Sequence, residues 1–260
     1  MPAELVGKTA LITGSDRGIG AAIATGLARA GADVILLART ADQLDETANV
    51  IRASASGVEV RIVTADLTDD TQRATAIDDL LSGGPVDVLI NNAATVEPLG
   101  ASATISPAQL RQAFEINVIA PATLTAALTP GMVKASWGRI VNVSSSVVGH
   151  PASMIGGNAN AATKAALEVH SRNVAAELDG TGVTVNVYRP GGVDTAMQGW
   201  IRSQDPQGIG AGLHDRFVSR YDSGALLTPQ ESASALLGHL LGEDGERTGA
   251  IWELGDTVTA

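Results

Sequence analysis

The sequence predicts a single α/β domain over residues 1–260, with a doubly wound parallel sheet of seven strands and helices on both faces. Apolar strand-like runs alternate with amphipathic helical patterns from end to end. A glycine-rich turn joins the first run to the first helix. The chain is long enough for one large domain, and no repeat, low-complexity tract or linker divides it. These observations favour one domain over two.

The individual elements follow from apolar runs and from helix start signals. Ser106-Pro107-Ala108-Gln109 is a capping box with proline at the first helical position, and predicts a helix to about Leu128. Thr228-Pro229-Gln230-Glu231 repeats that signature before a last helix that ends near Leu241. The predicted strands are Lys8–Thr13, Asp33–Ala38, Val58–Thr64, Val86–Asn91, Arg139–Ser144, Val183–Arg189 and Ala250–Leu254.

The segment Ala196–Leu227 interrupts the alternation. It carries five glycines interleaved with large apolar residues such as Trp200, Leu213 and Phe217. Long segments of this kind in compact domains are functional lids or mobile loops. The apolar residues favour a lid (196–227) that packs over a ligand, and a mobile surface loop is the alternative.

Composition excludes several classes of function. The net charge of −11 is unsuited to nucleic acid or an anionic membrane surface. The chain has no cysteine, which excludes disulfides, thiolate catalysis and cysteine-ligated metals, and we predict no metal site. Met1–Gly7 lacks the pattern of a secretory signal, and we expect no membrane-spanning segment. A soluble, cytoplasmic protein is therefore expected.

The turn Thr13–Gly20 lies between the first predicted strand and the first predicted helix. Gly14 permits a tight turn, Gly18 allows a ligand to approach the backbone, and Gly20 allows the helix to pack closely on the strand. A helix that begins in this way presents free N–H groups and its positive dipole end to a phosphate. By itself the turn is compatible with a purely structural role.

Further motifs follow this turn in a specific order, and together with it they resemble the short-chain dehydrogenase/reductase family of the compact single-domain type. The likeness covers essentially the whole chain and implies a Rossmann-like fold. The motifs are Asp66-Leu67, Asn91-Asn92-Ala93-Ala94, Asn117, Arg139–Ser145, Pro190-Gly191 and Thr195.

The resemblance also implies a nicotinamide dinucleotide cofactor. The positions that would bind it are Gly14, Ser15, Arg17, Gly18, Ile19, Gly20, Arg39, Asp66, Leu67, Asn91, Ala93, Lys164, Pro190, Gly191, Val193 and Thr195.

The charges near the end of the second strand bear on the choice of nucleotide. A carboxylate there would bind the adenosine ribose and repel a 2′-phosphate. This chain has Ala38 followed by Arg39, with Arg17 in the first turn, and two guanidinium groups suit a phosphate. The sequence therefore favours NADP(H), with NAD(H) as the alternative.

The family's active centre is a relay of asparagine, serine, tyrosine and lysine. The matching residues here are Asn117, Ser145, Asn160 and Lys164, so that an asparagine stands at the tyrosine position. An amide does not release a proton near neutral pH, and Asn160 is therefore expected only to orient substrate or water.

Four other residues could replace the missing acid, and a fifth could serve recognition. Arg189 occupies a position that the family generally fills with a small residue; it could bind a substrate carboxylate or carbonyl, or pair with an acidic side chain. The candidate acids are His150, Tyr188, Tyr221 and His214.

Two functions are compatible with these residues. The first is an NADP(H)-dependent oxidoreductase that interconverts a carbonyl and a secondary alcohol on an apolar small molecule, with an atypical active site. The second is a nucleotide-binding homologue without redox turnover, acting as a sensor, a partner subunit or a non-redox enzyme. The resemblance also implies a homodimer or homotetramer, formed through the helices near 109–128 and 158–178 and through the segment Trp252–Asp256.

Overall fold

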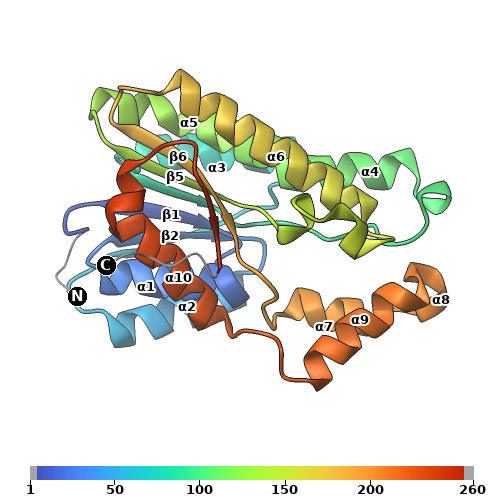
Figure 1. The fold of residues 1–260 in the computed structure, drawn as a ribbon. Helices are drawn as coiled ribbons and strands as arrows, with labels where there is room; N and C mark the ends of the chain where they lie inside the picture. The colour runs from blue at the N-terminus through green and yellow to red at the C-terminus, as the bar shows by residue number, and fades with distance from the viewer. Residues whose placement is uncertain (1–4, 255–260) are drawn as a thin grey trace.

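Seven parallel strands form one sheet in the order β3-β2-β1-β4-β5-β6-β7, in a computed structural model that describes residues 5–254 (Figure 1). The order reverses beside β1, which pairs with both β2 and β4, and ligands of doubly wound sheets bind at this switch point. The strands are β1 (Thr9–Thr13), β2 (Asp33–Ala38), β3 (Val60–Thr64), β4 (Val88–Asn91), β5 (Gly138–Val143), β6 (Val183–Arg189) and β7 (Ile251–Glu253).

Helices cover both faces of the sheet (Figure 1), as predicted. On one face lie α1 (Gly18–Arg29), α2 (Ala41–Ser54) and α10 (Pro229–Leu241). The other face is covered by α3 (Asp70–Ser82), α5 (Ala120–Lys134) and α6 (Asn158–Glu177). An aliphatic core fills each layer, because the strand side chains alternate between the two faces.

Both predicted capping boxes are present. Ser106 and Gln109 bond reciprocally at the start of α4 (Pro107–Phe114), and Thr228 and Glu231 do so at the start of α10. The backbone N–H groups that a helix start leaves unpaired are partly satisfied in this way.

The helix that starts at Pro107 is longer than the prediction. It continues through a π-type turn (Glu115–Ile119, η2) and α5 to Lys134, six residues beyond Leu128. Pro130 does not end it, because Pro130 and Ala126 are both exposed and water can bind the carbonyl that loses its N–H partner. By length and composition alone this helix could span a membrane, contrary to our expectation; in the fold, however, Leu124, Leu128 and Met132 pack against the sheet.

The segment 196–227 is helical. It forms α7 (Ala196–Arg202), α8 (Pro206–Ile209) and α9 (Ala211–Asp222), although its glycines suggested irregular structure. Gly199 and Gly212 lie inside these helices, whose apolar residues pack on the domain and compensate for the low helix propensity of glycine. We call this segment the lid. Its two ends are joined, because Asp194 N donates to Leu227 O and Leu227 N donates to Gly192 O.

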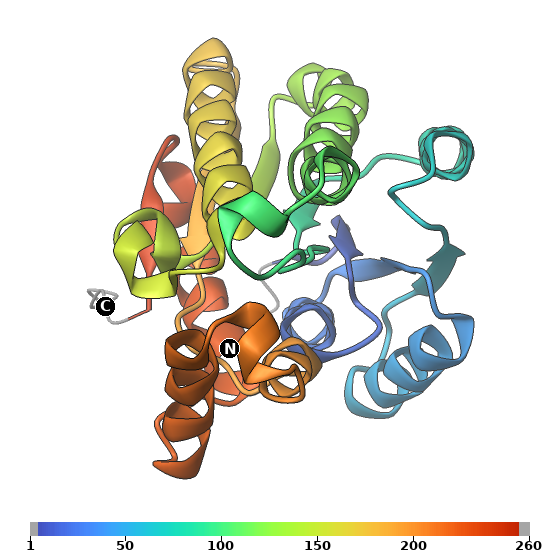
Figure 2. The same ribbon diagram turned by 90° about the vertical axis from the view of Figure 1, so that its right-hand side faces the viewer.

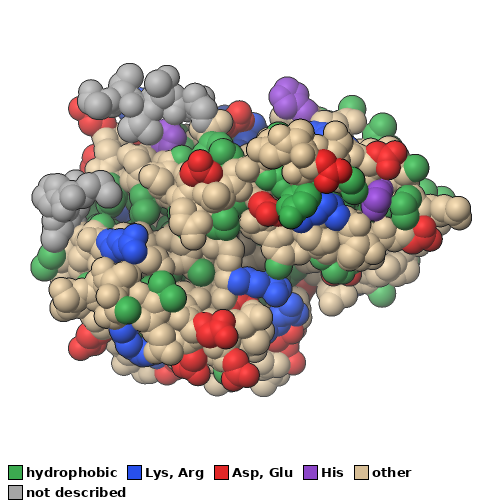
Figure 3. Space-filling model, turned by 90° about the horizontal axis from the view of Figure 1, so that it is seen from below, with side chains coloured by type: hydrophobic (Ala, Val, Ile, Leu, Met, Phe, Trp, Pro, Cys, Tyr) green, Lys and Arg blue, Asp and Glu red, His purple; other side chains and the backbone are tan. Residues whose placement is uncertain are grey.

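Figure 2 looks onto the carboxyl ends of the strands, with the lid helices below and α6 above. The short helices η1 (Ser102–Thr104), η3 (Ser146–Val148) and η4 (Pro151–Met154) also lie at this end, whereas η5 (Glu243–Glu246) precedes β7. Seen from below in Figure 3, Lys and Arg side chains occur in small, separate groups among acidic ones. The lid thus lies at the same end of the sheet as the switch point beside β1, where ligands of such sheets bind.

Candidate functional site

The glycine turn between β1 and α1 has the conformation that its sequence predicts. Gly14 and Gly18 have φ values of +62° and +58°, which side-chain-bearing residues rarely adopt. A Cβ atom on Gly20 would lie 2.1 Å from the carbonyl oxygen of Gly14, so that only glycine allows α1 to approach so closely. The first turn of α1 is thereby held against the end of β1, where it faces a ligand at the switch point.

Asn92 and Thr13 hold this turn, and sequence reasoning missed their role. The Asn92 side-chain amide donates to the carbonyl oxygens of Thr13 and Gly14, both at 3.0 Å. The Thr13 hydroxyl accepts from the amides of Asn92 and Ala93. Asn91, a predicted cofactor-binding residue, turns its buried side chain toward β5 and donates to Asn142 at 2.8 Å.

Two features of the turn fit the phosphates of a dinucleotide. Ser15 is fully buried, and its hydroxyl has no hydrogen-bond partner among the described residues. Buried polar groups rarely stay unpaired, and an acceptor from a ligand would satisfy this one. Arg17 at the N-cap of α1 makes no side-chain capping bond, which leaves the first-turn N–H groups available. Ile19 follows in the first turn, where it packs against the core.

Arg39 and Asp66 lie together at the ends of β2 and β3. Their closest charged atoms are 3.7 Å apart, and 68% of the Arg39 side chain is exposed. Partial burial would raise the pKa of Asp66, but hydrogen bonds from Thr68 and the charge of Arg39 lower it below its ordinary value. Arg39 is therefore held loosely beside an ionised carboxylate, and a ligand phosphate could displace that pairing.

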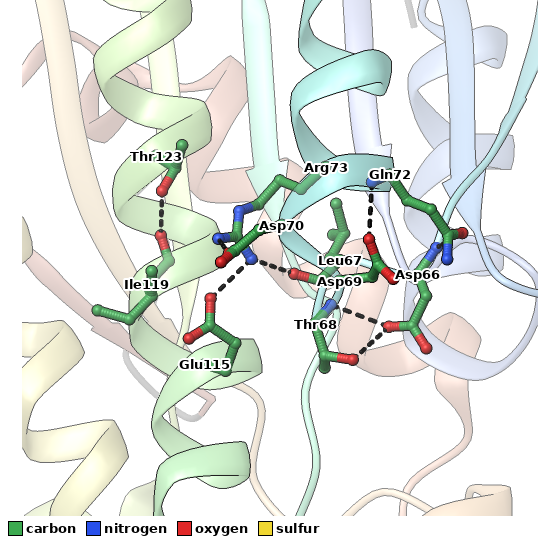
Figure 4. Close-up of polar contacts among 10 residues, drawn as sticks. All are labelled: Asp66, Leu67, Thr68, Asp69, Asp70, Gln72, Arg73, Glu115, Ile119 and Thr123. Atoms are coloured by element: carbon green, nitrogen blue, oxygen red, sulfur yellow. Dashed lines mark hydrogen bonds and ion pairs between the residues drawn. The ribbon is translucent and has the colours of Figure 1, made fainter.

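The loop after β3 is tied to the long helix by a buried arginine (Figure 4). Arg73 donates to the carbonyl oxygen of Leu67 and pairs with Asp70 and with Glu115, the latter at 2.7 Å. The Leu67 side chain is buried in the core, so that this residue offers a ligand only its backbone. Arg73 thus fixes the adenine-side loop relative to the π-type turn that contains Asn117.

Asn117 uses its side chain for structure. Its carbonyl oxygen accepts from Thr95 N, and its amide donates to Thr95 O and to the Thr163 hydroxyl at 2.9 and 3.0 Å. Asn117 is fully buried within the π-type turn, a distortion that often marks functional sites. It therefore joins the loop after β4 to α6 directly beside Lys164.

Lys164 reaches the end of β5, which Ser145 follows two residues later. Lys164 Nζ donates to the carbonyl oxygen of Val143 at 2.7 Å, two residues before Ser145. The Ser145 hydroxyl accepts from Val147 N, which leaves its O–H group able to donate. Burial lowers the pKa of Lys164 to about 8, although the nearby charge of Glu168 opposes this shift. Lys164 can consequently exchange a proton near neutral pH.

Asn160 lies one helical turn before Lys164 and is buried. Its amide nitrogen is 3.7 Å from the sulfur of Met154, a weak contact. The Asn160 side chain does not replace the phenol as a general acid or base, because an amide does not titrate near neutral pH.

The structure removes one of the proposed substitute acids. Tyr188 points into the core, fully buried, and its hydroxyl bonds to Ser232; burial raises the pKa of its phenol. His214 Nε2 is 3.1 Å from Arg202 O within the lid. Tyr221 is half exposed and stacks under the Arg202 guanidinium, and His150 is exposed after η3.

The loop after β6 reaches the glycine turn. The methyl group of Thr195 would lie 3.5 Å from a Cβ on Gly18, and the Thr195 hydroxyl caps α7. Gly191 has a φ of +75°, and Val193 bridges to Leu227 at the lid base. Pro190 precedes them, and its carbonyl oxygen accepts from the Ser232 hydroxyl. The start of the lid therefore lies beside the proposed phosphate site.

Arg189 is an ion-pairing residue. Its guanidinium contacts Glu168 through two hydrogen bonds of 2.8 Å and also pairs with Glu253. The structure thus favours the ion-pair interpretation over recognition of a substrate carboxylate. The partner Glu168 is buried, whereas the sequence suggested a surface acid.

The lid closes over this centre with apolar side chains. Val147 and Met154, which flank the candidate catalytic residues, form a cluster with Ile201, Ile209 and Leu213 of the lid. At the tip, a Cβ on Gly156 would lie 2.7 Å from Ile209 O, so the backbones nearly touch. The lid and the segment that carries the candidate catalytic residues thus share one apolar cluster.

Comparison with known proteins agrees with this arrangement. Ketoacyl reductase HetN from Nostoc sp. is 35% identical over 190 residues, which cover 72% of this chain and 64% of that protein. Two solved structures superpose with TM-scores of 0.82: a putative NAD(P)-dependent gluconate 5-dehydrogenase from Beutenbergia cavernae with bound NADP (30% identity, 97% of both chains), and an NADP-bound 3-oxoacyl (acyl-carrier-protein) reductase from Agrobacterium tumefaciens (33%, 96% and 93%).

The short chain dehydrogenase family matches residues 8–206, which include the glycine turn, Ser145, Lys164 and the loop after β6. The chain spans a little under two thirds of the length of HetN, but nearly all of the two solved structures. The match covers most of the chain and agrees with the order of its strands and with the geometry of its site. This protein therefore belongs to the short-chain dehydrogenase/reductase family of oxidoreductases.

Proposed function

We propose that the protein is an NADP(H)-dependent carbonyl reductase for an apolar small molecule, in which Lys164 and water replace the usual phenol as the proton source. One observation carries this proposal. Lys164 is buried, donates to the strand end two residues before Ser145, has a pKa of about 8 and lies one turn from an asparagine that does not titrate.

The dinucleotide site is supported by the unpaired hydroxyl of Ser15 and the open first turn of α1. The absence of a side chain on Gly18 would let a pyrophosphate approach the backbone beside Thr195, whereas Gly14 packs against Ala93, whose Cα would lie 2.9 Å from an added Cβ. When bound, the nicotinamide supplies or accepts the hydride. Bound NADP in the two superposed structures supports the same nucleotide for this chain.

The protein's own residues would then manage the carbonyl oxygen and its proton. The Ser145 hydroxyl donates to the oxygen and orients it. The Lys164 ammonium passes a proton toward that oxygen through a water molecule and recovers it from solvent. Asn160 orients the water by hydrogen bonding but does not exchange protons itself. In the oxidative direction the same groups act in reverse, with neutral Lys164 as the base.

Arg39→Ala is expected to alter cofactor preference. Because a guanidinium favours a 2′-phosphate and Asp66 opposes one, the loss of Arg39 should raise the KM for NADPH about tenfold and leave the KM for NADH nearly unchanged. Steady-state kinetics with both cofactors would measure this. Arg52→Ala, at the end of α2, is the control. Equal effects on both cofactors would contradict the assignment.

The substrate class is inferred from the lid. The buried lid residues that pack with Val147 and Met154 are Ile201, Ile209 and Leu213, and Trp200 and Phe217 lie against the same cluster. Such a lining suits an apolar, ring-containing or aliphatic carbonyl compound. The ketoacyl reductases among the similar proteins act, by their names, on carbonyl compounds of this general kind.

We further propose that the chain assembles as a homodimer or homotetramer through α5 and α6. Val169 on α6 is 71% exposed, and Leu110, Ile119 and Val133 on the long helix are also exposed. Apolar side chains on two adjacent helices form a surface that a second copy would bury. Light scattering at micromolar concentration should give at least twice the monomer mass of 26.4 kDa, and a monomer would contradict the proposal.

The experiment that tests the enzymatic proposal compares the wild type with Asn160→Tyr. NADPH binding would be titrated by fluorescence, and turnover would be followed by nicotinamide absorbance against ketones, quinones and ring alcohols. We expect the wild type to bind NADPH and to reduce a ketone, with a rate that falls as the pH rises through 8 because Lys164 loses its proton. Asn160→Tyr should be faster and should extend activity to higher pH.

The outcome also decides between the two functions. If both proteins bind NADPH but only Asn160→Tyr turns over a substrate, the native chain binds nucleotide without redox catalysis. Asn160 is the specific observation that favours this second function, since it removes the usual acid while the nucleotide turn is retained.

A further inference from the structure

A buried carboxylate lies one helical turn after Lys164. Glu168 on α6 has a side chain that is 6% exposed, and its Oε1 and Oε2 accept from Arg189 Nε and Nη2, each at 2.8 Å. The Ser144 hydroxyl donates to Oε1 at 2.7 Å. Three hydrogen bonds, two of them from a guanidinium fork, therefore fix this carboxylate in one orientation.

The contacts of Glu168 join the elements that carry the candidate active site. Ser144 directly follows β5 and precedes Ser145, and the Val143 carbonyl that binds Lys164 stands one residue earlier. Arg189 ends β6 and precedes the loop that leads to the lid. On its other side Arg189 pairs with Glu253 of β7. One side chain on α6 thus positions the ends of β5 and β6 relative to Lys164.

A contribution to stability does not by itself explain why charged residues occupy this buried position. A buried ion pair gives little net stability over apolar side chains of similar size, because each ion loses its hydration. The charged groups that face Glu168 are Lys164 on its own helix and Arg189 from β6, with Glu253 beyond; Ser144 from β5 is neutral. Among these groups, Glu168 is the carboxylate on the same helix as Lys164, and its charge favours the Lys164 ammonium.

We propose that Glu168, clamped by Arg189, is a positioning residue that keeps Lys164 protonated and holds the strand end that presents Ser145. The proposal rests on the reductase function above, in which Lys164 carries the proton. Glu168 itself does not touch the substrate. Its charge offsets the desolvation of the ammonium, and its bond to Ser144 fixes the backbone on which both candidate catalytic groups depend.

The titration of Lys164 tests this role without any need for turnover. The chain has only three lysines, Lys8, Lys134 and Lys164, so that lysine labelled with ¹³C at the ε-carbon gives three resolvable NMR titrations. The signal of Lys164 is identified by its loss in Lys164→Met. Lys164 should titrate near pH 8 in the wild type.

Glu168→Gln preserves the shape and the Ser144 bond but removes the charge. We expect the pKa of Lys164 to fall by about one unit, because a nearby opposite charge stabilises the ammonium. The protonated fraction at pH 8 would then drop from about a half to about a tenth, and the alkaline limb of kcat for ketone reduction should move by the same amount. Glu177→Gln at the other end of α6 is the matched control and should move neither.

Two further variants separate charge from structure. Glu168→Asp keeps the charge and should restore most of the Lys164 titration. The exchange Glu168→Arg with Arg189→Glu re-forms an ion pair but places a positive charge beside Lys164, and it should lower the pKa further. An unchanged Lys164 titration in Glu168→Gln, or its restoration by the exchange, overturns the proposal. If the titration shifts as expected but no substrate is reduced, the reductase function fails while the electrostatic role of Glu168 stands.

Discussion

Lys164→Met should lower turnover by about 10²–10⁴-fold while making the protein more stable near neutral pH. The loss of turnover follows from removal of the group that supplies the proton, which typically contributes a factor of this size. The gain in stability follows from burial. The pKa of Lys164 falls from 10.5 in the unfolded chain to about 8 in the fold, which corresponds to roughly 3 kcal/mol of unfavourable free energy below pH 8.

The sign of this effect depends on pH. Between about pH 8 and 10.5 the unfolded chain binds more protons at Lys164 than the folded chain does, so its contribution to stability rises with pH across this window. Below pH 8 the penalty is fully present. The hydrogen bond to Val143 offsets about 1 kcal/mol of it, so the net gain in Lys164→Met should be about 1–2 kcal/mol at pH 7.

Urea unfolding of the cofactor-free protein at pH 7 and 10 measures this prediction. The wild type should gain stability between the two values relative to Lys164→Met. Lys134→Met, at the exposed end of α5, is the control and should follow the wild type. A Lys164→Met protein that is less stable than the wild type at pH 7 would contradict the burial argument, and one that keeps full turnover would contradict the proton-transfer role of Lys164.

Gly20→Ala should abolish nucleotide binding in practice, with a rise of about 100-fold or more in the Kd for NADPH. The added Cβ would lie 2.1 Å from Gly14 O and 2.5 Å from the Asn92 amide, and the nearest of these atoms belongs to backbone. The helix α1 must therefore move off the turn, which breaks the Asn92 bonds and misaligns the first-turn N–H groups. Overpacking of this kind should also lower the free energy of unfolding by about 3 kcal/mol.

Gly131→Ala is the matched control for this change. Gly131 also lies within a helix, α5, but a Cβ there would meet no atom within 4 Å. This variant should bind NADPH normally and gain up to about 1 kcal/mol from the higher helix propensity of alanine. Fluorescence titration with NADPH and thermal unfolding would compare the two. Wild-type affinity in Gly20→Ala would show that the close approach of α1 does not serve nucleotide binding.

The elements that depend on local patterns could be predicted from the sequence. All seven strands lie within two residues of their predicted bounds at each end, because buried parallel strands form distinct apolar runs. Both capping boxes are also local signals. The end of the long helix was not predictable from Pro130, because only the fold shows that the affected carbonyl faces water. The lid helices were likewise hidden by their glycines, since their stability comes from packing against the domain.

The candidate site could also be predicted only where it depends on local motifs. The positions of Ser145, Lys164 and the glycine turn follow from motif order, and the structure brings Ser145 and Lys164 to one strand end. Which of two adjacent asparagines faces the turn was not predictable, since the direction of Asn91 and Asn92 depends on where β4 ends. An ion pair was one of the two roles predicted for Arg189, but its partner Glu168 was not predictable, because the two residues lie on different elements.

The closed base of the lid has a consequence for changes in the length of this segment. Because Gly192, Asp194 and Leu227 are bonded to one another, the two ends of the intervening segment leave and rejoin the domain at one point. The sheet, its register and the nucleotide turn do not depend on how many residues lie between these ends. We therefore expect residues 196–226 to tolerate insertions that leave the sheet intact, whereas Thr195 lies beside Gly18 of the nucleotide turn and has to be kept.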